Sequence, residues 1–321
     1  MMPEPAKEPS DRLLKTQAPA KTVGGMRLST FDAFKRLEVE GAVPLEGELL
    51  ERLQRRLATI LDDILVVAAE TGARLILGGG TALGAVRHGG FIPWDDDLDV
   101  NVPRADWPRF RNAFRARFAG KYEIYEPGDP AGYGFGFPRI RLVGTRFVTR
   151  EDVVAPSPCT GVFVDVFLLE DVPDNPLFRR LHGWGSLVLG FLYSCRKAFA
   201  ERRVYRAWGL TGGVFRHKRW IGFCLAFLGL GRWTRLWNWW NGLCRNGKSR
   251  FVTYPAGRRH YFGELAPREE QAPGTPRLFE GRTCPCAAGV EAYMVRLYGA
   301  DYMTPPPPEM RERHVVFGID L

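Results

Sequence analysis

The stretch 78-GGGTALGAVRHGGFIPWDDDLDV-100 joins a glycine-rich turn to an unusual run of acidic residues. Four aspartates, Asp95, Asp96, Asp97 and Asp99, fall within five residues, so their ionised carboxylates repel one another. A positive charge is needed to keep these carboxylates close together in a folded protein. The source of that charge is the main functional question that this stretch raises.

The acidic run continues into a predicted strand, because 97-DLDVNV-102 alternates polar and aliphatic residues. Alternate side chains of a strand share a face, so we expect Asp97 and Asp99 to point the same way. Asp95 joins them if the strand extends back that far. Asp96 points away and is expected to be a structural acid or one that supports the metal ligands from behind. A second predicted strand, 162-VFVDVFLLE-170, carries the isolated acid Asp165 among apolar residues.

A divalent cation bound by these carboxylates accounts for the arrangement. A lone carboxylate in a buried strand is costly unless it is paired or binds a metal. Hard oxygen ligands suit Mg²⁺ or Mn²⁺. We therefore expect a metal site formed by Asp95, Asp97, Asp99 and Asp165.

The glycine run completes a predicted phosphate site. Residues 78–80 are all glycine and leave backbone N–H groups open, and Thr81 begins a helical turn. Backbone amides and a helix N-terminus attract phosphate, so Gly79, Gly80 and Thr81 are candidate phosphate-binding residues. Phosphates on this turn and metals on the acids give a layout for in-line displacement at phosphorus.

Several basic residues are weaker candidates for the same site. Arg87 and His88 directly follow the glycine-rich helix and are expected to contact phosphate or the acceptor; alternatively, they pack against Trp94. Arg139 and Arg141 alternate on a predicted strand and so share a face. Arg141 is the candidate for stabilising phosphate charge, with a surface ion pair as the alternative.

Two other interpretations of the acidic run remain less favourable. A solvated loop is the usual setting for such a run, but the alternation with Leu98 and Val100 favours a half-buried strand. Asp95, Asp97 and Asp99 fit the first three ligand positions of an EF-hand loop. Such a loop also requires glycine at the position of Val100 and glutamate at the position of Asp106, so the match fails there.

Composition sets broad limits on the protein class. The 321 residues are 45% hydrophobic and 25% charged, and the net charge of +9 permits an anionic partner without choosing one. The six cysteines are predicted to be free thiols, because Cys284 and Cys286 lack the two-residue gap of a zinc knuckle.

The N-terminus lacks a signal-like apolar core, and no apolar run reaches the roughly 18 residues of a membrane span. We therefore expect a cytoplasmic protein, with peripheral contact to a membrane left open.

The hydrophobic pattern predicts a mixed α/β fold of the α+β type, with a core sheet and flanking helices. Predicted helices cover 30–38, 46–72, 81–90 and 104–120, and predicted strands cover 73–79, 97–102, 122–126, 135–143 and 162–170. We expect a flexible tail (1–26), a catalytic core (27–176), a mainly helical insert (177–257) and a C-terminal segment that packs back on the core (258–321).

The expected insert is rich in tryptophan and arginine. Seven of the nine tryptophans fall between residues 184 and 240, interleaved with arginines. Core packing of helices is the default interpretation, and docking on a membrane surface is the second. Nucleic-acid binding is the third and least favoured, because the basic charge is spread along the chain. We therefore expect no nucleic-acid partner.

The motifs together resemble a known family. A glycine pair, a short helix and Asp-x-Asp on a strand resemble the nucleotidyltransferase fold of the DNA polymerase β type. The longer stretch 79-GGTALGAVRHGGFIPWDDDLDV-100 is similar to the LicD phosphocholine-transferase family, which includes the fukutin-related proteins. The segments 162-VFVDVFLLEDVPDN-175 and 298-YGADYMTPPPPEMRERH-314 resemble its second acidic strand and its C-terminal signature.

The resemblance implies a transferase that moves phosphocholine or phosphoribitol from a CDP-activated donor to a hydroxyl of a glycan or lipid-linked glycan, with CMP leaving. It implies catalytic roles for Asp97 and Asp99 as metal ligands, and for Asp165 as a third acid able to take the acceptor proton. Two alternatives stay open. One is a nucleotidyltransferase that forms a nucleotidylated sugar, and the other is a non-catalytic protein that binds a membrane or a glycan-assembly complex.

Overall fold

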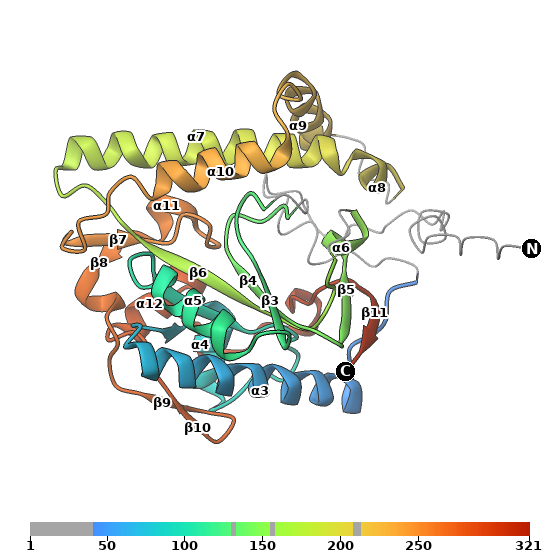
Figure 1. The fold of residues 1–321 in the computed structure, drawn as a ribbon, viewed down its shortest axis with the longest axis vertical. Helices are drawn as coiled ribbons and strands as arrows, with labels where there is room; N and C mark the ends of the chain where they lie inside the picture. The colour runs from blue at the N-terminus through green and yellow to red at the C-terminus, as the bar shows by residue number, and fades with distance from the viewer. Residues whose placement is uncertain (1–40, 130–132, 155–157, 208–212) are drawn as a thin grey trace, which may run out of the picture.

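The protein has a mixed α+β fold built on a seven-stranded sheet (Figure 1). The computed structural model describes residues 41–321 except 130–132, 155–157 and 208–212, so the predicted helix 30–38 lies outside the described residues. The sheet follows the order β1 (Ile76–Leu77), β2 (Asp99–Pro103), β6 (Phe163–Asp171), β4 (Arg139–Leu142), β3 (Tyr122–Tyr125); β7 (Phe251–Thr253) pairs with β6, and β8 (Ala266–Pro267) pairs with β7. The α+β class is confirmed, and the likeness to polymerase β stays a prediction.

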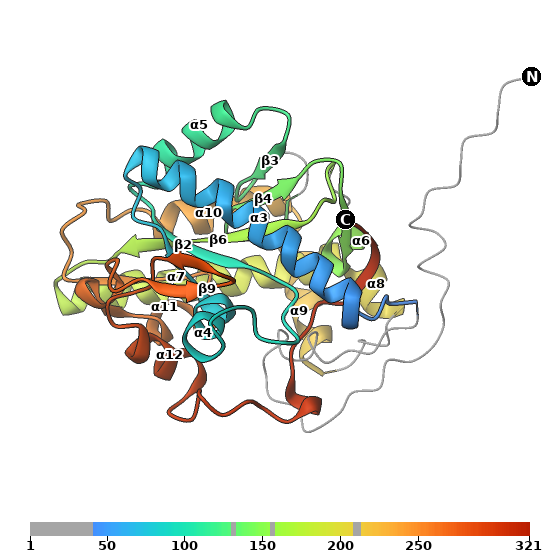
Figure 2. The same ribbon diagram turned by 90° about the horizontal axis from the view of Figure 1, so that it is seen from below.

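Helix α3 (Gly47–Thr71) has one apolar stripe that packs into the core. Leu50, Leu53, Leu57 and Leu61 recur at helical spacing and are buried. The helix ends at Gly72, whose left-handed φ of 63° lets its N–H reach the carbonyls of the last turn. The predicted helix 46–72 and its glycine cap are therefore confirmed. Figure 2 shows α3 beside α5 (Trp107–Arg117), which the sequence predicted as 104–120.

The glycine-rich stretch forms a strand–helix–strand unit. Strand β1 is shorter than the predicted 73–79, because helix α4 (Gly79–Arg87) already begins at Gly79 rather than at Thr81. The next strand, β2, begins at Asp99 rather than at residue 97. The Gly78 N–H donates to the Asp99 carbonyl at 2.9 Å, which ties the turn to the start of β2. Asp97 therefore lies in the preceding loop, and its direction does not follow from strand alternation.

The two acidic strands are neighbours, as predicted. Strands β2 and β6 are parallel, and Asp99 and Asp165 occupy directly paired positions. The predicted strand 162–170 corresponds to β6. The predicted strand 122–126 corresponds to β3, and 135–143 shortens to β4.

Four helices form a layer on the side of the sheet opposite α3 (Figure 1). These are α7 (Pro176–Ala200), α8 (Arg202–Ala207), α9 (Gly213–Cys224) and α10 (Leu230–Asn241). Asn175 begins α7 by accepting the N–H groups of Leu177 and Phe178, and Pro176 supplies a fixed φ at the first position. The helical character predicted for this region is confirmed. No helix in the described ranges is long and apolar enough to cross a membrane.

The default interpretation of the tryptophans, core packing, holds for only part of them. Trp233 and Trp237 are buried in the helical layer. Trp184, Trp220 and Trp239 are 62%, 72% and 52% exposed. Core packing therefore does not account for these three residues.

The C-terminal segment returns to the core. It contributes α11 (His260–Gly263), η1 (Arg268–Gln271), the hairpin β9 (Arg277–Phe279) and β10 (Arg282–Cys284), α12 (Val290–Tyr298), η2 (Pro308–Met310) and β11 (Val316–Asp320). Strand β11 pairs with β5 (Arg146–Thr149), which leads into α6 (Arg150–Val154). All six cysteines are free thiols, as predicted.

Candidate active site

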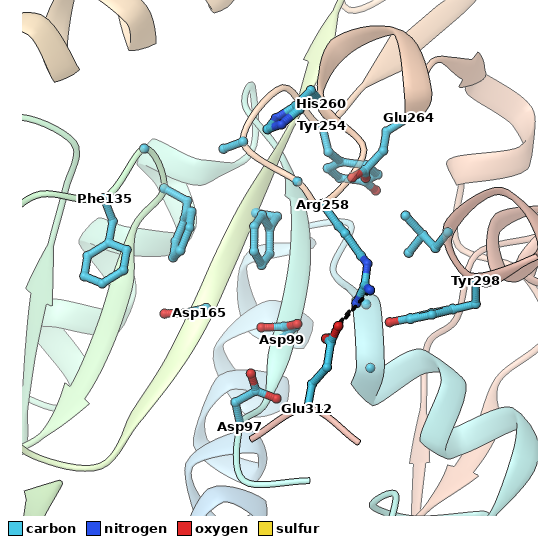
Figure 3. Close-up of a pocket in the computed structure, with 18 of the residues that line it drawn as sticks. Asp97, Asp99, Phe135, Asp165, Tyr254, Arg258, His260, Glu264, Tyr298 and Glu312 are labelled. Carbon is cyan, nitrogen blue, oxygen red and sulfur yellow. Dashed lines mark hydrogen bonds and ion pairs between the residues drawn. The ribbon is translucent and has the colours of Figure 1, made fainter. Parts of the chain in front are cut away.

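A cavity of about 1130 Å³ lies between the acidic strands, the helical layer and the C-terminal segment. Its walls include Gly79, Gly80, Asp95, Asp97, Asp99 and Asp165 from the core, Ser186, Lys197 and Trp237 from the helical layer, and Tyr254, Arg258 and His314 from the C-terminal segment. Figure 3 shows Asp97, Asp99 and Asp165 gathered at this cavity. Residues far apart in the sequence thus converge on the predicted acids.

Asp165 is held by a buried arginine. Arg139 donates from Nε and Nη2 to the two carboxylate oxygens of Asp165 at 2.6 and 2.9 Å. Both side chains are buried. Burial opposes the charged form of Arg139, but the charge and hydrogen bonds of Asp165 prevail and raise the pKa of the guanidinium above its usual value. Part of the positive charge that the acids require therefore comes from Arg139.

Arg141 lies two residues along the same strand and has a different setting. Its Nη2 donates to Asp152 at 2.7 Å and its Nη1 donates to the Gly161 carbonyl at 3.1 Å. The side chain is buried and does not line the cavity, whereas Arg139 does. The geometry thus favours Arg139, rather than the predicted Arg141, as the arginine that contacts phosphate, because only Arg139 lies at the cavity and binds Asp165.

The glycine turn packs directly against the aspartates. Gly79 has a left-handed φ of 42°, and a Cβ at this position would lie 2.7 Å from Asp99 Oδ2. A Cβ at Gly80 would lie 3.1 Å from Asp95 Oδ2. Only glycine therefore permits this close approach of the α4 N-terminus to the acids. The positive end of the α4 helix dipole also offsets part of the negative charge of these carboxylates.

Two expected phosphate-binding groups have structural partners. The Gly79 N–H donates to the hydroxyl of Tyr293 at 3.2 Å, so it is not open as the sequence suggested. Thr81 is buried and its hydroxyl accepts the Asp99 N–H at 2.8 Å. Thr81 thus positions the first residue of β2 and does not line the cavity.

Arg87 reaches the cavity, and His88 does not. Arg87 lines the wall and donates from Nη1 to the Tyr302 carbonyl at 2.8 Å. Its Nε donates to His88 Nε2 at 2.9 Å. Partial burial, followed by the charge of Arg87, lowers the pKa of His88, which favours the neutral imidazole needed to accept this bond. His88 is exposed at the surface beside Arg87.

Asp96 pairs with a histidine from the C-terminal segment. It is buried, and it accepts the backbone N–H and the Nδ1–H of His314, both at 2.9 Å. His314 Nδ1 also lies 3.8 Å from Asp97 Oδ2. Asp96, Asp97 and His314 form the one group of potential metal ligands within 4.8 Å of one another among the described residues. The predicted set of Asp95, Asp97, Asp99 and Asp165 is not gathered that closely.

Several residues at the cavity were not among the site residues singled out from the sequence. The Arg258 guanidinium makes a two-pronged ion pair with Glu312 at 2.7 and 2.8 Å, on the side of the cavity away from Phe135 (Figure 3). Burial raises the pKa of the Glu264 carboxyl to about 7, although the Arg259 N–H opposes this. Tyr293 joins the glycine turn to α12. These residues come from the C-terminal segment, where only the motif at 298–314 pointed to the site.

The comparisons with known proteins agree with this site. Residues 72–130 match the family model described as "LicD/FKTN/FKRP, nucleotidyltransferase domain", which spans the glycine turn and the acidic run. The lipopolysaccharide cholinephosphotransferase LicD of Haemophilus influenzae is 26% identical over 252 residues, covering 74% of this chain and 85% of the relative. Both findings confirm the resemblance to the LicD family that the motifs predicted.

Proposed function

We propose that this protein transfers a phospho-alcohol from a CDP-activated donor to a glycan hydroxyl, with CMP as the leaving group and a divalent cation bound at the acids. The observation that carries the proposal is the pairing of Asp99 with Asp165 beside the N-terminus of α4, at the wall of a large cavity. The similarity to the lipopolysaccharide cholinephosphotransferase of H. influenzae supports phosphocholine as the transferred group.

The donor set fits a hard divalent cation. Asp97 and Asp99 present carboxylate oxygens at the cavity, and Asp95 lies beside Gly80. Oxygen ligands of this kind suit Mg²⁺ or Mn²⁺. When bound, such an ion neutralises developing charge on phosphoryl oxygens. Asp165 also fits the set, because each carboxylate oxygen has a second lone pair besides the one that accepts from Arg139.

The N-terminus of α4 is proposed to hold the donor phosphates. Since Tyr293 occupies the Gly79 N–H, the next amide of the first turn, that of Gly80, is the better candidate. The helix end favours negative charge, and the missing Cβ lets a phosphate approach the backbone. Arg87, at the other end of α4, adds a positive charge at the same wall.

Arg139 and Asp165 are proposed to act together on the reacting groups. Asp165 takes the proton of the acceptor hydroxyl as that oxygen attacks phosphorus. Arg139 Nη1 is buried and makes no hydrogen bond within the described ranges of the chain. It therefore has a donor left for a phosphoryl oxygen, in addition to the two that hold Asp165.

A thermal-shift titration tests the donor and the cation together. The protein is heated with CDP-choline, CDP-ribitol, CDP-glycerol, CTP or UTP, each with and without Mg²⁺. A ligand at 100 times its Kd stabilises the folded state by about 2.7 kcal/mol, so a matching donor raises the Tm clearly. We expect one CDP-alcohol to give a Mg²⁺-dependent shift, and Asp99→Asn to remove the Mg²⁺-dependent part.

Product analysis separates the proposal from its rivals. Release of CMP in the presence of a glycan acceptor supports phospho-alcohol transfer. A shift with CTP and release of pyrophosphate would instead indicate nucleotidyl transfer. No shift with any nucleotide, with or without Mg²⁺, would contradict both and favour a binding protein.

A further inference from the structure

The helical layer carries an unusual charge. Between residues 177 and 257 there are fifteen Lys and Arg residues and a single acidic residue, Glu201. The rest of the chain has thirty Lys and Arg residues against thirty-five acidic ones. The net positive charge of the protein therefore resides in residues 177–257, most of which form the helical layer, and the remainder is slightly negative.

Helix α7 exposes an apolar stripe to solvent, outside the cavity. Leu177, Leu181, Trp184 and Val188 follow the spacing i, i+4, i+7 and i+11, and all four are exposed. Ser186, Leu187, Gly190 and Phe191 of the same helix line the cavity. None of the four stripe residues lines it. Arg180 is exposed beside it.

Helices α9 and α10 also combine exposed aromatic residues with arginines. On α9, Arg216, Arg219, Trp220 and Phe223 share one face by their spacing, and Trp220 and Phe223 are more than half exposed. On α10, Arg232, Arg235 and Trp239 lie at i, i+3 and i+7, and all three are exposed. Each helix thus presents tryptophan and arginine together on its exposed face.

The exposed rings lie close to one another around the N-terminal half of α7. Trp184 packs edge-on against Phe262 of α11 with ring centroids 5.9 Å apart. Trp239 lies against Trp240, whose ring packs where a Cβ of Gly185 would be. The stripe on α7 is therefore continuous with aromatic residues of α10 and α11. Figure 1 shows α7, α9 and α10 together at one edge of the molecule.

We propose that this face of α7, α9 and α10 docks on an anionic lipid surface. Tryptophan and arginine suit the boundary between lipid headgroups and acyl chains, and each basic residue gains from the negative surface potential. A second copy of the chain fits less well, because two faces with this excess of arginine repel each other. Docking through the stripe leaves the cavity free, since none of its four residues lines the cavity. The proposal does not depend on the reaction proposed above.

Vesicle co-sedimentation of the full chain tests the proposal. The vesicles contain phosphatidylcholine alone or phosphatidylcholine mixed with phosphatidylglycerol. We expect binding to the mixed vesicles that weakens as salt is raised. Replacing Arg180, Arg216 and Arg232 by alanine should weaken it roughly a hundredfold, since each basic residue near such a surface contributes about fivefold. Trp184→Ser with Trp220→Ser should weaken it by at least about tenfold.

Matched controls lie on other parts of the surface. Arg55 on α3 and Leu278 on β9 are exposed away from the helical layer, so Arg55→Ala and Leu278→Ser should leave vesicle binding unchanged. Asp97→Asn should also bind vesicles normally, which separates this surface from the active site. Absence of vesicle binding, equal binding to both lipid mixtures, or no effect of the tryptophan and arginine variants would overturn the proposal. Self-association that Trp184→Ser with Trp220→Ser abolishes, without vesicle binding, would show that a second copy covers the face.

Discussion

Replacing Arg139 by methionine should destabilise the fold strongly, because it leaves Asp165 without its partner. Arg139 and Asp165 are 2% and 8% exposed and are joined by two hydrogen bonds. The Asp99 carboxylate occupies the paired position on the adjacent strand and adds like-charge repulsion. Removing one partner of a buried pair typically costs about 3–5 kcal/mol. That is a large part of the roughly 5–15 kcal/mol that stabilises a domain.

The matched control is Arg141→Met on the same strand. Arg141 is equally buried and pairs with Asp152, so its loss should cost a similar free energy of unfolding. It does not line the cavity, so nucleotide binding by the folded protein should stay unchanged, whereas Arg139→Met should weaken it. The double variant Arg139→Met with Asp165→Leu should recover most of the lost stability, because no unpaired charge remains.

Urea unfolding followed by circular dichroism measures these free energies. Titration calorimetry with the CDP-alcohol that gives the Mg²⁺-dependent thermal shift measures binding. A cost of less than about 1 kcal/mol for Arg139→Met, or a double variant as unstable as the single one, would show that the buried pair does not stabilise the fold as proposed. Equal loss of nucleotide binding in both arginine variants would show that Arg139 has no special place at the cavity.

Three further perturbations follow from the site. Asp97→Asn should lower transfer by roughly a thousandfold with little change in Tm, since loss of the cation removes several kcal/mol of charge stabilisation; activity close to wild type would contradict the ligand assignment. Gly79→Ala should destabilise more than Gly72→Ala in urea unfolding, because both have positive φ but only the Gly79 Cβ would meet Asp99, at 2.7 Å. For Glu264, the folded pKa of about 7 exceeds the ordinary 4.5, so its burial costs stability increasingly as pH rises between these values. Glu264→Gln should therefore gain up to about 3 kcal/mol relative to wild type at pH 8 and nothing at pH 4, and a pH-independent difference would refute this.

Strong periodicity made the main elements predictable from the sequence. The stripe of α3 and its glycine cap needed only local chemistry, and the isolated Asp165 in an apolar strand correctly indicated a neighbour of the Asp-x-Asp strand. Element boundaries near the site were less predictable. The Thr81 hydroxyl and Gly78 N–H bind Asp99, and these contacts set where β2 begins. Such hydrogen bonds cannot be predicted from residue spacing.

The choice between Arg139 and Arg141 also lay beyond the sequence. Strand alternation places both on one face, but it does not reveal which acid each one meets. Asp165 faces Arg139 because β4 and β6 pair in that register, and Asp152 reaches Arg141 from the short helix after β5. Register and helix placement are tertiary facts, so the local pattern left the two arginines equivalent.

The sequence by itself determined the α+β class, the family resemblance and the acidic residues of the candidate site, because these depend on local periodicity and on a long contiguous motif. Only the tertiary structure decided what surrounds those acids. The C-terminal segment supplies Tyr293, Arg258 and His314 to the site, although these residues lie far beyond the acidic run in the chain. The helical layer closes the cavity with one face and exposes tryptophan and arginine on the other. Burial and pairing depend on packing between distant segments, and no local pattern encodes them.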